Sequence, residues 1–450
     1  MKEFLKVGVS GVRGVVGESF TPQLAAAFAR AFGTFVGRGS VLVGRDTRPT
    51  GRMLEHAVVA GLQSVGCKPL LAGIVPTPTL LVLTRASAAR GGVVITASHN
   101  PSQWNALKFV DRNGLFLGPA RSDELLDVYH QGDFDMVPEQ DIPQTATSPD
   151  PMAIHFDKVF GYVDAAAVCA RRFKVAVDCC NGVGALHTRE FLERLGCEVV
   201  PCYDAPTGVF EREPEPLPEN LDALGALTMQ HGCDVGFAQD PDGDRLAIVD
   251  EHGAPLGEDI TVALAVRQVL ERHGNGPIVV HLSTSQSVQD VATRHGVAFV
   301  RTKIGEINVV QAMLECGAVA GGEGNGGVII PAIHPCRDSY AGMAVVLELM
   351  AMSGKTISVL RDEIPHYHML KDKVRVRGER APAILRALRR RYEREQMNLL
   401  DGVHVTLGDK WFHVRPSNTE PVIRLTVEAP DRKTAERLAA EVKAQIEALT

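Results

Sequence analysis

The chain alternates short apolar runs with longer segments whose apolar residues recur at helical spacing. In its first hundred residues this pattern predicts a strand at 41–43, a helix at 52–65, and further strands at 69–72 and 93–95. Such alternation is typical of βαβ crossovers, in which helices cover a largely parallel or mixed sheet. The first part of the chain is therefore expected to form an α/β domain.

The same alternation restarts twice between residues 174 and 300. The predicted strands are 175–177, 197–201, 234–238, 246–249, 278–281 and 298–300, and the predicted helices are 185–195, 220–230, 260–272 and 288–294. These segments indicate a second and a third α/β domain with an element order like that of the first.

The last eighty or so residues follow a different order. The predicted elements are a strand at 374–376, a very basic helix at 382–394, strands at 404–406, 411–414 and 422–428, and a closing helix at 432–449. Strands that follow one another without crossover helices indicate an antiparallel sheet with helices on one side.

A looser, proline-containing stretch at 133–151 is interpreted as the first linker. The pattern as a whole predicts three similar α/β domains with mixed sheets and a smaller C-terminal α+β domain with an antiparallel sheet. The predicted boundaries are 1–150, 151–254, 255–368 and 369–450.

Composition narrows the possible functions. A chain of 450 residues is too long for one compact core, and a net charge of -7 argues against broad nucleic-acid binding while leaving room for a local basic pocket. No leader-like apolar region and no run of membrane-spanning length is found, so we expect a cytoplasmic protein without a membrane partner. The nine cysteines include no C-x-x-C pair and predict no disulfide framework.

Ser98 lies in the run T-A-S-H-N-P (96–101), directly after the apolar segment 92–96. Short polar side chains and backbone amides after a strand form a natural phosphate cradle, and Lys108 could neutralise charge on a phosphoryl group. A serine on a loop more often only caps a helix, so these residues alone leave both roles open. A Ser-His-Asp triad would need G-x-S-x-G, and glycine is absent from both flanking positions.

Three carboxylates alternate in the run D-P-D-G-D-R (240–245). Asp240, Asp242 and Asp244 would repel one another unless a cation lies between them, and an all-oxygen ligand set suits Mg²⁺. A solvated acidic turn is the alternative. A calcium EF-hand is excluded because its sixth position requires glycine, and this chain has Arg245 there. The loop therefore predicts a magnesium site.

Two later loops carry side chains suited to a sugar phosphate. The run G-G-E-G-N-G-G (321–327) does not fit a dinucleotide motif in register, and a tight loop that presents Glu323 and Asn325 to sugar hydroxyls fits better than a flexible linker. The run R-P-S-N-T-E-P (415–421) offers Arg415, and Arg424 follows closely, so two guanidinium groups could grip a phosphate. A polar turn between two strands is the alternative there.

Together these four runs resemble the α-D-phosphohexomutases, which include phosphoglucomutase, phosphomannomutase and phosphoglucosamine mutase. The resemblance covers the whole chain, with one motif in each predicted domain and in the family's order. T-A-S-H-N-P and D-P-D-G-D-R together are highly specific, and the G-E-x-N-G-G form of the third run is similar to the archaeal-type phosphoglucosamine and phosphomannomutase branch.

The resemblance implies a role for each matching residue. Ser98 would be the phosphoserine, and an oxygen of its phosphate would join Asp240, Asp242 and Asp244 around Mg²⁺. The other implied residues are Arg13, Lys108, Arg245 and His99 near the reacting phosphoryl group, and Lys303, Glu323, Asn325, Arg415, Ser417, Asn418, Thr419 and Arg424 around the sugar and its second phosphate.

One position departs from the family's pattern. Many members close the sugar loop with a histidine that is a candidate proton acceptor, and this chain has Gly327 there. The general base is therefore left open between His99, His334 and Lys303.

The resemblance implies an enzyme that interconverts hexose 6-phosphate and hexose 1-phosphate through phospho-Ser98, with hexose 1,6-bisphosphate as primer. Phosphoglucosamine mutase is the first expectation, ahead of a phosphomannomutase or phosphoglucomutase of broad specificity. A Ser-dependent sugar phosphatase and a non-catalytic sugar-phosphate sensor are the alternatives. A hexose phosphate is the expected partner, and both a monomer and a homodimer fit the sequence.

Overall fold

A computed structural model of the chain describes residues 5–8, 11–148, 150–272, 274–376, 380–417 and 422–449. The chain divides into two compact units. Unit 1 comprises Met1–Thr261 and Gly326–Leu360, and unit 2 comprises Val262–Asn325 and Arg361–Thr450. Each unit is therefore assembled from two separate segments of the sequence.

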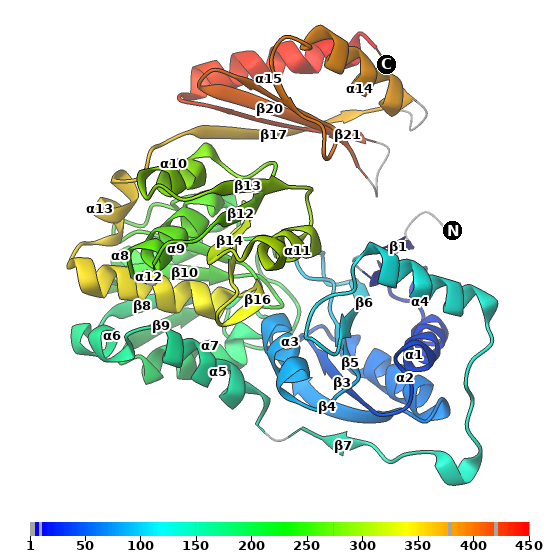
Figure 1. Cartoon of the computed structure of the whole chain (residues 1–450). Helices are drawn as coiled ribbons and strands as arrows, with labels where there is room; N and C mark the ends of the chain where they lie inside the picture. Colours follow the sequence, from blue (N-terminus) through cyan, green and yellow to red (C-terminus); the bar gives the residue numbers. More distant parts are fainter. Residues whose placement is uncertain are drawn as a thin grey trace. The chain divides into compact units, whose positions relative to one another are not determined.

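The first sheet of unit 1 has seven strands in the order β1-β2-β6-β5-β3-β4-β7. Strands β5, β3, β4 and β7 run parallel, whereas β1, β2, β6 and β5 pair antiparallel, so the sheet is mixed. Helices α1 and α2 lie on one face of this sheet and α3 lies on the other (Figure 1). The elements are β1 (Lys6–Gly8), β2 (Gly11–Val15), α1 (Pro22–Val36), β3 (Ser40–Arg45), α2 (Gly51–Ser64), β4 (Lys68–Ile74), α3 (Thr77–Ala86), β5 (Gly91–Ile95), β6 (Trp104–Asp111), α4 (Pro119–Gln131) and β7 (Ala146–Thr147).

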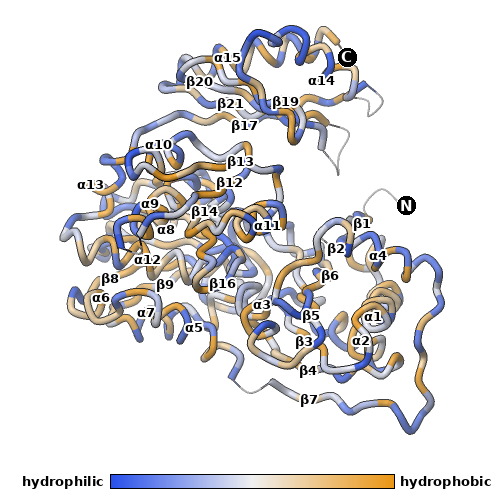
Figure 2. The backbone as a smooth tube through the Cα atoms, in the orientation of Figure 1, coloured by the Kyte–Doolittle hydropathy of each residue, from blue (hydrophilic) through white to orange (hydrophobic). Residues whose placement is uncertain are grey.

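Local sequence explains how α1 begins and which face it buries. Thr21 caps the helix by accepting a hydrogen bond from the backbone N–H of Leu24 at 3.3 Å, and Pro22 occupies the first helical position. Phe28 and Phe32 are fully buried, and their rings pack against Phe109 of β6. The hydrophobic stretch of α1 is visible in Figure 2. This packing anchors the helix layer to the strands whose ends carry the site.

The second sheet of unit 1 has the order β11-β10-β8-β9, in which β10, β8 and β9 are parallel and β11 is antiparallel to β10. The run 240–245 forms the turn between β10 and β11. The elements are α5 (Pro151–Tyr162), α6 (Ala165–Arg171), β8 (Lys174–Asp178), α7 (Gly184–Arg194), β9 (Glu198–Cys202), α8 (Asp222–His231), β10 (Val235–Gln239) and β11 (Leu246–Val249).

The segment 326–360 of unit 1 contributes a short antiparallel pair, β15 (Gly327–Ile330) and β16 (His334–Arg337), followed by α12 (Ser339–Ser353). Helix α12 is buried on all sides over most of its length. None of the described helices has both the length and the apolar character required to cross a bilayer.

Unit 2 contains two groups of strands. Strands β13, β12 and β14 pair in parallel, and a separate five-stranded sheet is antiparallel throughout, in the order β17-β21-β20-β19-β18. Helices α14 and α15 cover one face of the antiparallel sheet (Figure 1). The elements are β12 (Ile278–His281), α10 (Gln286–Arg294), β13 (Phe299–Thr302), α11 (Glu306–Cys316), β14 (Ala320–Glu323), β17 (His368–Arg375), α14 (Ala381–Arg391), β18 (Gln396–Asn398), β19 (Val403–Leu407), β20 (Lys410–Pro416), β21 (Val422–Ala429) and α15 (Arg432–Glu447), while α9 (Glu258–Arg272) and α13 (Ile357–Asp362) include residues of both units.

The predicted fold class is confirmed. Three groups of elements combine parallel and antiparallel strand pairs with helices, and the C-terminal group is an antiparallel sheet with two helices on one side. The segment interpreted as a linker holds a short 3₁₀ turn at Glu139–Asp141 and strand β7, which extends the first sheet beside β4. The four exact domain boundaries stay predictions.

Candidate functional site

Ser98 lies on the loop between β5 and β6, at the carboxyl end of β5. Its backbone φ is 52°, in the left-handed region that residues other than glycine rarely adopt. The buried Oγ donates a hydrogen bond to Oδ2 of Asp240 at 3.1 Å and lies 3.4 Å from Nδ1 of His99. The loop after β5 and the acidic turn after β10 therefore meet at one hydroxyl group.

The three aspartates of the acidic turn converge as the sequence predicts. Ligand atoms of Asp240, Asp242 and Asp244 all lie within 4.8 Å of one another, and all three side chains are buried. Burial and the two neighbouring carboxylates raise the pKa of Asp240 well above its usual range. Burial also acts to raise the pKa of Asp242, but Lys108 and a hydrogen bond from Thr77 hold it below its usual value.

These oxygens fit a divalent cation. Among the described residues, Oδ1 of Asp242 and Oδ1 of Asp244 are buried without a hydrogen-bond partner. Burying a carboxylate oxygen without a hydrogen bond destabilises the folded protein, and so does repulsion among three adjacent carboxylates. A hard cation bound between them would offset both effects. An all-carboxylate set that leaves room for phosphate oxygens and water suits Mg²⁺.

Two of the predicted cations lie beside this cluster. Lys108 on β6 forms an ion pair with Asp242, with 3.0 Å between Nζ and Oδ2. Arg13 on β2 donates from Nη1 to Oδ1 of Asn100 at 3.0 Å, and burial together with the like charge of Arg245 lowers the pKa of Arg13. Positive charge is thus held close to the Ser98 loop.

Arg245 and His99 form a direct pair. Nη2 of Arg245 lies 2.9 Å from Nδ1 of His99, and Nη1 of Arg245 donates to Oε1 of Glu215 at 2.7 Å. Because a guanidinium group only donates, Nδ1 of His99 must accept and is unprotonated. The charge of Arg245, burial and the charge of Arg13 lower the pKa of His99 well below its usual range. The neutral ring of His99, whose Nδ1 already accepts from Arg245, is better suited to orienting Arg245 than to acting as a general base.

His334, another candidate base, is buried with its Nε2 2.7 Å from the carbonyl oxygen of Gly114. Nε2 must donate in this bond, so that nitrogen has no lone pair with which to accept a proton. Burial lowers the pKa of His334 to about 4. The environment of His334 therefore favours a structural role.

Two residues that clamp the acidic turn were missed by the sequence analysis. Thr77, at the start of α3, donates from its backbone N–H to the carbonyl of Asp242 at 2.9 Å and from Oγ1 to Oδ2 of Asp242 at 2.8 Å. Arg337, at the end of β16, donates to Oδ2 of Asp244 at 2.5 Å. Thr77 lies five residues beyond the end of the predicted strand 69–72, which was a weak signal, whereas Arg337 lies 93 residues from Asp244 and gave none.

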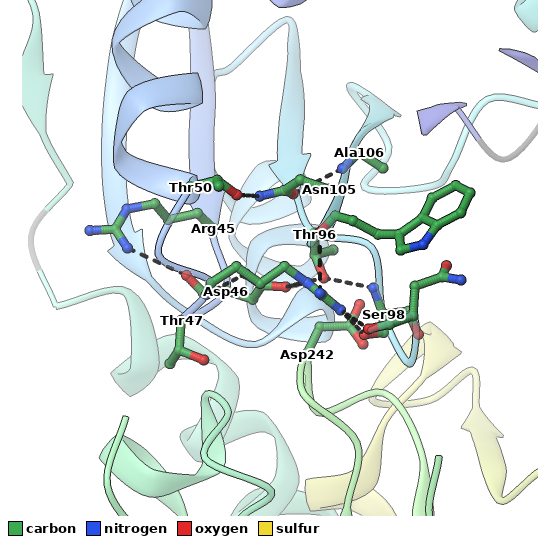
Figure 3. Close-up of polar contacts among 12 residues, drawn as sticks. Arg45, Asp46, Thr47, Thr50, Thr96, Ser98, Asn105, Ala106 and Asp242 are labelled. Carbon is green, nitrogen blue, oxygen red and sulfur yellow. Dashed lines mark hydrogen bonds and ion pairs between the residues drawn. The ribbon is translucent and has the colours of Figure 1, made fainter. Parts of the chain in front are cut away.

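A second missed group supports the Ser98 loop. Asp46 and Arg48 follow the carboxyl end of β3, which is parallel to β5. Thr96 donates to Oδ2 of Asp46 at 2.7 Å, and Oγ1 of Thr96 accepts from the backbone N–H of Ser98 at 3.0 Å (Figure 3). Polar residues directly after the predicted strand 41–43 were the signal, because adjacent parallel strands end at the same edge of a sheet.

The predicted sugar-loop residues lie in unit 2. Glu323 ends β14 and is buried, and its Oε1 accepts from the backbone N–H of Gly305 at 3.2 Å. Asn325 follows in the turn after β14, and the exposed Lys303 follows β13. Gly321 and Gly322 belong to β14 and not to the loop; at Gly321 a Cβ atom would lie 1.8 Å from the carbonyl oxygen of Val279.

The predicted phosphate grip is also in unit 2. Arg415 on β20 and Arg424 on β21 are direct partners in the antiparallel register. Burial lowers the pKa of Arg415, as does the charge of Arg424, and Glu323 acts in the opposite direction. Ser417 ends this strand pair by donating its N–H to the carbonyl of Val422 at 2.9 Å. Asn418 and Thr419 lie outside the described residues.

Comparison with known proteins covers the whole chain. Four domain families match in order: phosphoglucomutase/phosphomannomutase alpha/beta/alpha domain I at residues 5–136, domain II at 128–253, domain III at 257–367, and the C-terminal domain at 373–445. Each of the four motif runs falls within a different one of these matches.

Full-length relatives show the same likeness. A Thermococcus kodakarensis phosphoglucomutase/phosphomannomutase is 38% identical over 98% of each chain, and a Methanopyrus kandleri protein named probable phosphoglucosamine mutase is 37% identical over 96% of this chain and 95% of its own. A crystal structure of a phosphoglucomutase/phosphomannomutase family protein from Burkholderia thailandensis has a TM-score of 0.87 at 25% identity, covering 99% of this chain and 98% of that one.

Proposed function

This chain belongs to the phosphoglucomutase/phosphomannomutase family of enzymes, and we propose that it interconverts hexose 6-phosphate and hexose 1-phosphate through a phosphorylated Ser98. The observation that carries this proposal is the 3.1 Å contact between Oγ of Ser98 and Oδ2 of Asp240. It supports a reactive hydroxyl beside three converging carboxylates and several fixed cations, which are the groups that phosphoryl transfer requires.

In the forward step a free hydroxyl of the hexose phosphate attacks the phosphorus of phospho-Ser98. The new P–O bond to the sugar forms as the bond to Oγ breaks; the attacking sugar hydroxyl gives up one proton and the leaving Oγ of Ser98 takes up one, so the free serine hydroxyl is restored. The bisphosphorylated sugar then reorients in the site, so that its other phosphoryl group faces Ser98 and is transferred back to the serine. Arg13, Lys108 and Arg245 stabilise the negative charge on the transferring oxygens, since their cationic groups already lie around this loop.

Asp240, Asp242 and Asp244 would hold the Mg²⁺. When bound, such a cation supplies charge stabilisation to phosphoryl oxygens. The buried Oδ1 atoms of Asp242 and Asp244, which have no hydrogen-bond partner within the described part of the chain, support this assignment.

The hexose phosphate itself is assigned to the side chains of unit 2. The cross-strand pair Arg415 and Arg424 would bind the phosphate that is not reacting, because two adjacent guanidinium groups match its oxygens. Ser417, Asn418 and Thr419 would add donors, and Lys303, Glu323 and Asn325 would contact the sugar. These assignments come from the family motifs.

Phosphoglucosamine mutase is the proposed specificity, with a phosphomannomutase or phosphoglucomutase as the alternative. Relatives of both names match with nearly equal identity, 37% and 38%, so the choice rests on assay. The cytoplasmic location, the oligomeric state and hexose 1,6-bisphosphate as primer stay predictions.

The test is a substrate panel. The purified protein, primed with glucose 1,6-bisphosphate in the presence of Mg²⁺, is given the 6-phosphates of glucosamine, mannose and glucose, and the products are followed by ³¹P NMR. A 1-phosphate with little inorganic phosphate supports the mutase, and the highest kcat/KM names the sugar. Stoichiometric release of inorganic phosphate would instead identify a phosphatase. If no substrate were converted, the protein would be a non-catalytic sugar-phosphate sensor.

A further inference from the structure

Arg48 is a buried cation that the reaction as described above does not use. Its side chain is wholly inaccessible, and Nε forms an ion pair with Oδ2 of Asp46 at 3.0 Å. The four remaining N–H groups donate to backbone carbonyls of the loop that carries Ser98. Those carbonyls belong to Ser98, Asn100, Pro101 and Trp104, at 2.6, 2.6, 2.6 and 3.2 Å.

We propose that Arg48 is a positioning residue that fixes the Ser98 loop in the conformation required for phosphoryl transfer, an inference that rests on the proposed function. A guanidinium group has five N–H donors in one plane, and all five are used here. Lysine offers three donors from a single atom and cannot reach the same five acceptors. The site therefore requires arginine specifically and not only a positive charge.

The conformation that Arg48 holds is one that the loop would not keep by itself. The left-handed φ of Ser98 is unfavourable for a residue with a Cβ atom and persists only where surrounding bonds determine it. Thr96 accepts from the N–H of Ser98, and Arg48 donates to its carbonyl. Oδ2 of Asp46 accepts from both Thr96 and Arg48, so one carboxylate joins the two supports.

The side chains of Arg48 and Asp46 are wholly shielded from water. The ring of Phe210 covers the guanidinium plane at 4.9 Å, and Gly208 lies so close that a Cβ atom there would meet the carbonyl oxygen of Thr47 at 2.3 Å. Thr47 in turn donates to the carbonyl of Asn181 at 2.9 Å. The bond to the carbonyl of Ser98 is buried, so that carbonyl would have no ready substitute for its arginine donor, and we expect the loop to move.

Among the described residues, the hydrogen bonds that Arg48 donates all run to Asp46 and to backbone carbonyls, and none runs to Oγ of Ser98. Its effect on the reaction would therefore pass through the geometry of the loop. Misplacement of a reacting atom by about 1 Å can lower a rate by about 100-fold. Substrate binding to other residues would be left intact.

The test compares Arg48→Lys with Arg45→Lys, a control at the same strand end whose Nε lies 3.4 Å from Glu55. For Arg48→Lys we expect kcat to fall by about 100-fold with KM within about twofold of the parent, and hydrogen exchange of peptides covering 97–104 to accelerate. Arg45→Lys should change neither quantity. An Arg48→Lys variant with parental kcat, or with parental exchange in these peptides, overturns the proposal.

A second variant keeps the proposal testable if Arg48→Lys does not fold. Thr96→Val keeps the branched shape of the side chain and removes only the hydroxyl that joins Asp46 to Ser98. It should lower kcat by about tenfold at constant KM and raise exchange in the same peptides. Parental values in both measurements would refute the network. If the parent protein shows no mutase activity, the proposed function fails, while the exchange comparison still decides the role of Arg48.

Discussion

Thr77 donates a hydrogen bond from Oγ1 to Oδ2 of Asp242 at 2.8 Å, and its backbone N–H donates to the carbonyl of the same aspartate at 2.9 Å. The start of α3 is thereby fixed to the acidic turn between β10 and β11. Asp242 also pairs with Lys108 at 3.0 Å through the same Oδ2 atom. Its other oxygen, Oδ1, is buried and has no hydrogen-bond partner among the described residues. This oxygen is therefore free to bind a metal ion.

Thr77→Val should weaken Mg²⁺ binding. Valine keeps the shape of the side chain but removes the hydroxyl that orients Asp242, and loss of such a supporting bond typically costs about tenfold in metal affinity or activity. The measurement is the Mg²⁺ dependence of turnover together with a direct titration by calorimetry. Thr84→Val is the matched control, because Oγ1 of Thr84 donates within α3, to the carbonyl of Leu80, and to no other group among the described residues. Equal Mg²⁺ affinity in both variants would contradict the role of Thr77.

Ser98→Ala should abolish turnover and leave the fold intact. No other group in the described site offers a hydroxyl at the position beside Asp240, so the phosphoryl group would have no acceptor. Intact-protein mass spectrometry after incubation with bisphosphate should show one added phosphate in the parent and none in the variant. Ser102→Ala, on the same loop, is the control and should be phosphorylated normally. Substantial isomerisation by Ser98→Ala would remove the basis of the proposed mechanism.

Ser98 and Arg48 differ in whether a local sequence pattern can predict their role in the site. The spacing of the three aspartates in one short run already predicts a metal site, and the short run around Ser98 carries the family resemblance that implies its role. Arg48 acts through bonds to residues 50 to 56 positions away, and its partners are backbone carbonyls that any sequence would supply. Only the parallel pairing of β3 with β5 brings these residues together, and pairing between strands is a tertiary property.

Helix α12 shows the same limit for the fold. The sequence analysis predicted no helix over Ser339–Ser353, because an amphipathic pattern requires one face in water. This helix is buried from Ser339 to Met350 without a gap, and even Glu348 is inside, accepting from the backbone N–H of Asp164 at 2.7 Å. Elements with one solvated face, such as α10 and α14, were predicted to within a few residues of their ends.

Asp240→Asn should make the metal-free protein more stable and remove its response to Mg²⁺. Burial and the charges of Asp244 and Asp242 oppose ionisation of Asp240, so its pKa is raised, and a neutral amide relieves that repulsion. Thermal unfolding in EDTA should therefore shift upward in the variant relative to the parent. Addition of Mg²⁺ should stabilise only the parent. If Mg²⁺ does not change the unfolding temperature of the parent protein, the metal assignment is contradicted.

Arg415→Ala should raise KM while kcat falls less. The guanidinium group of Arg415 is assigned to the phosphate that does not react, and its loss removes binding that ground state and transition state share. Arg424 remains beside the vacated position and should retain part of the grip. Arg432→Ala is the control, because that side chain is exposed on α15 and its ion pair within the described residues is with Glu436. An unchanged KM in Arg415→Ala would rule out the assignment.

The stability of unit 2 should fall in acid through His404. Burial first, and then the charge of Arg301, lowers the pKa of His404 to about 3, and among the described residues its buried Nε2 has no hydrogen-bond partner. The unfolded chain takes up a proton near pH 6.5 and the folded chain does not, so stability is lost as pH falls from about 6.5 towards 3. The expected loss is roughly 3 kcal/mol at pH 4.

His404→Phe tests this origin of the acid sensitivity, because phenylalanine keeps a ring against Trp411, whose centroid lies 4.8 Å from that of His404. The urea midpoint, followed by tryptophan fluorescence, should fall less between pH 7 and pH 4 in this variant than in the parent. His252→Gln is the control, since that side chain is already 74% exposed before unfolding. Equal pH dependence in the parent and in His404→Phe would show that other groups cause the acid sensitivity, and His404 would then have no part in it.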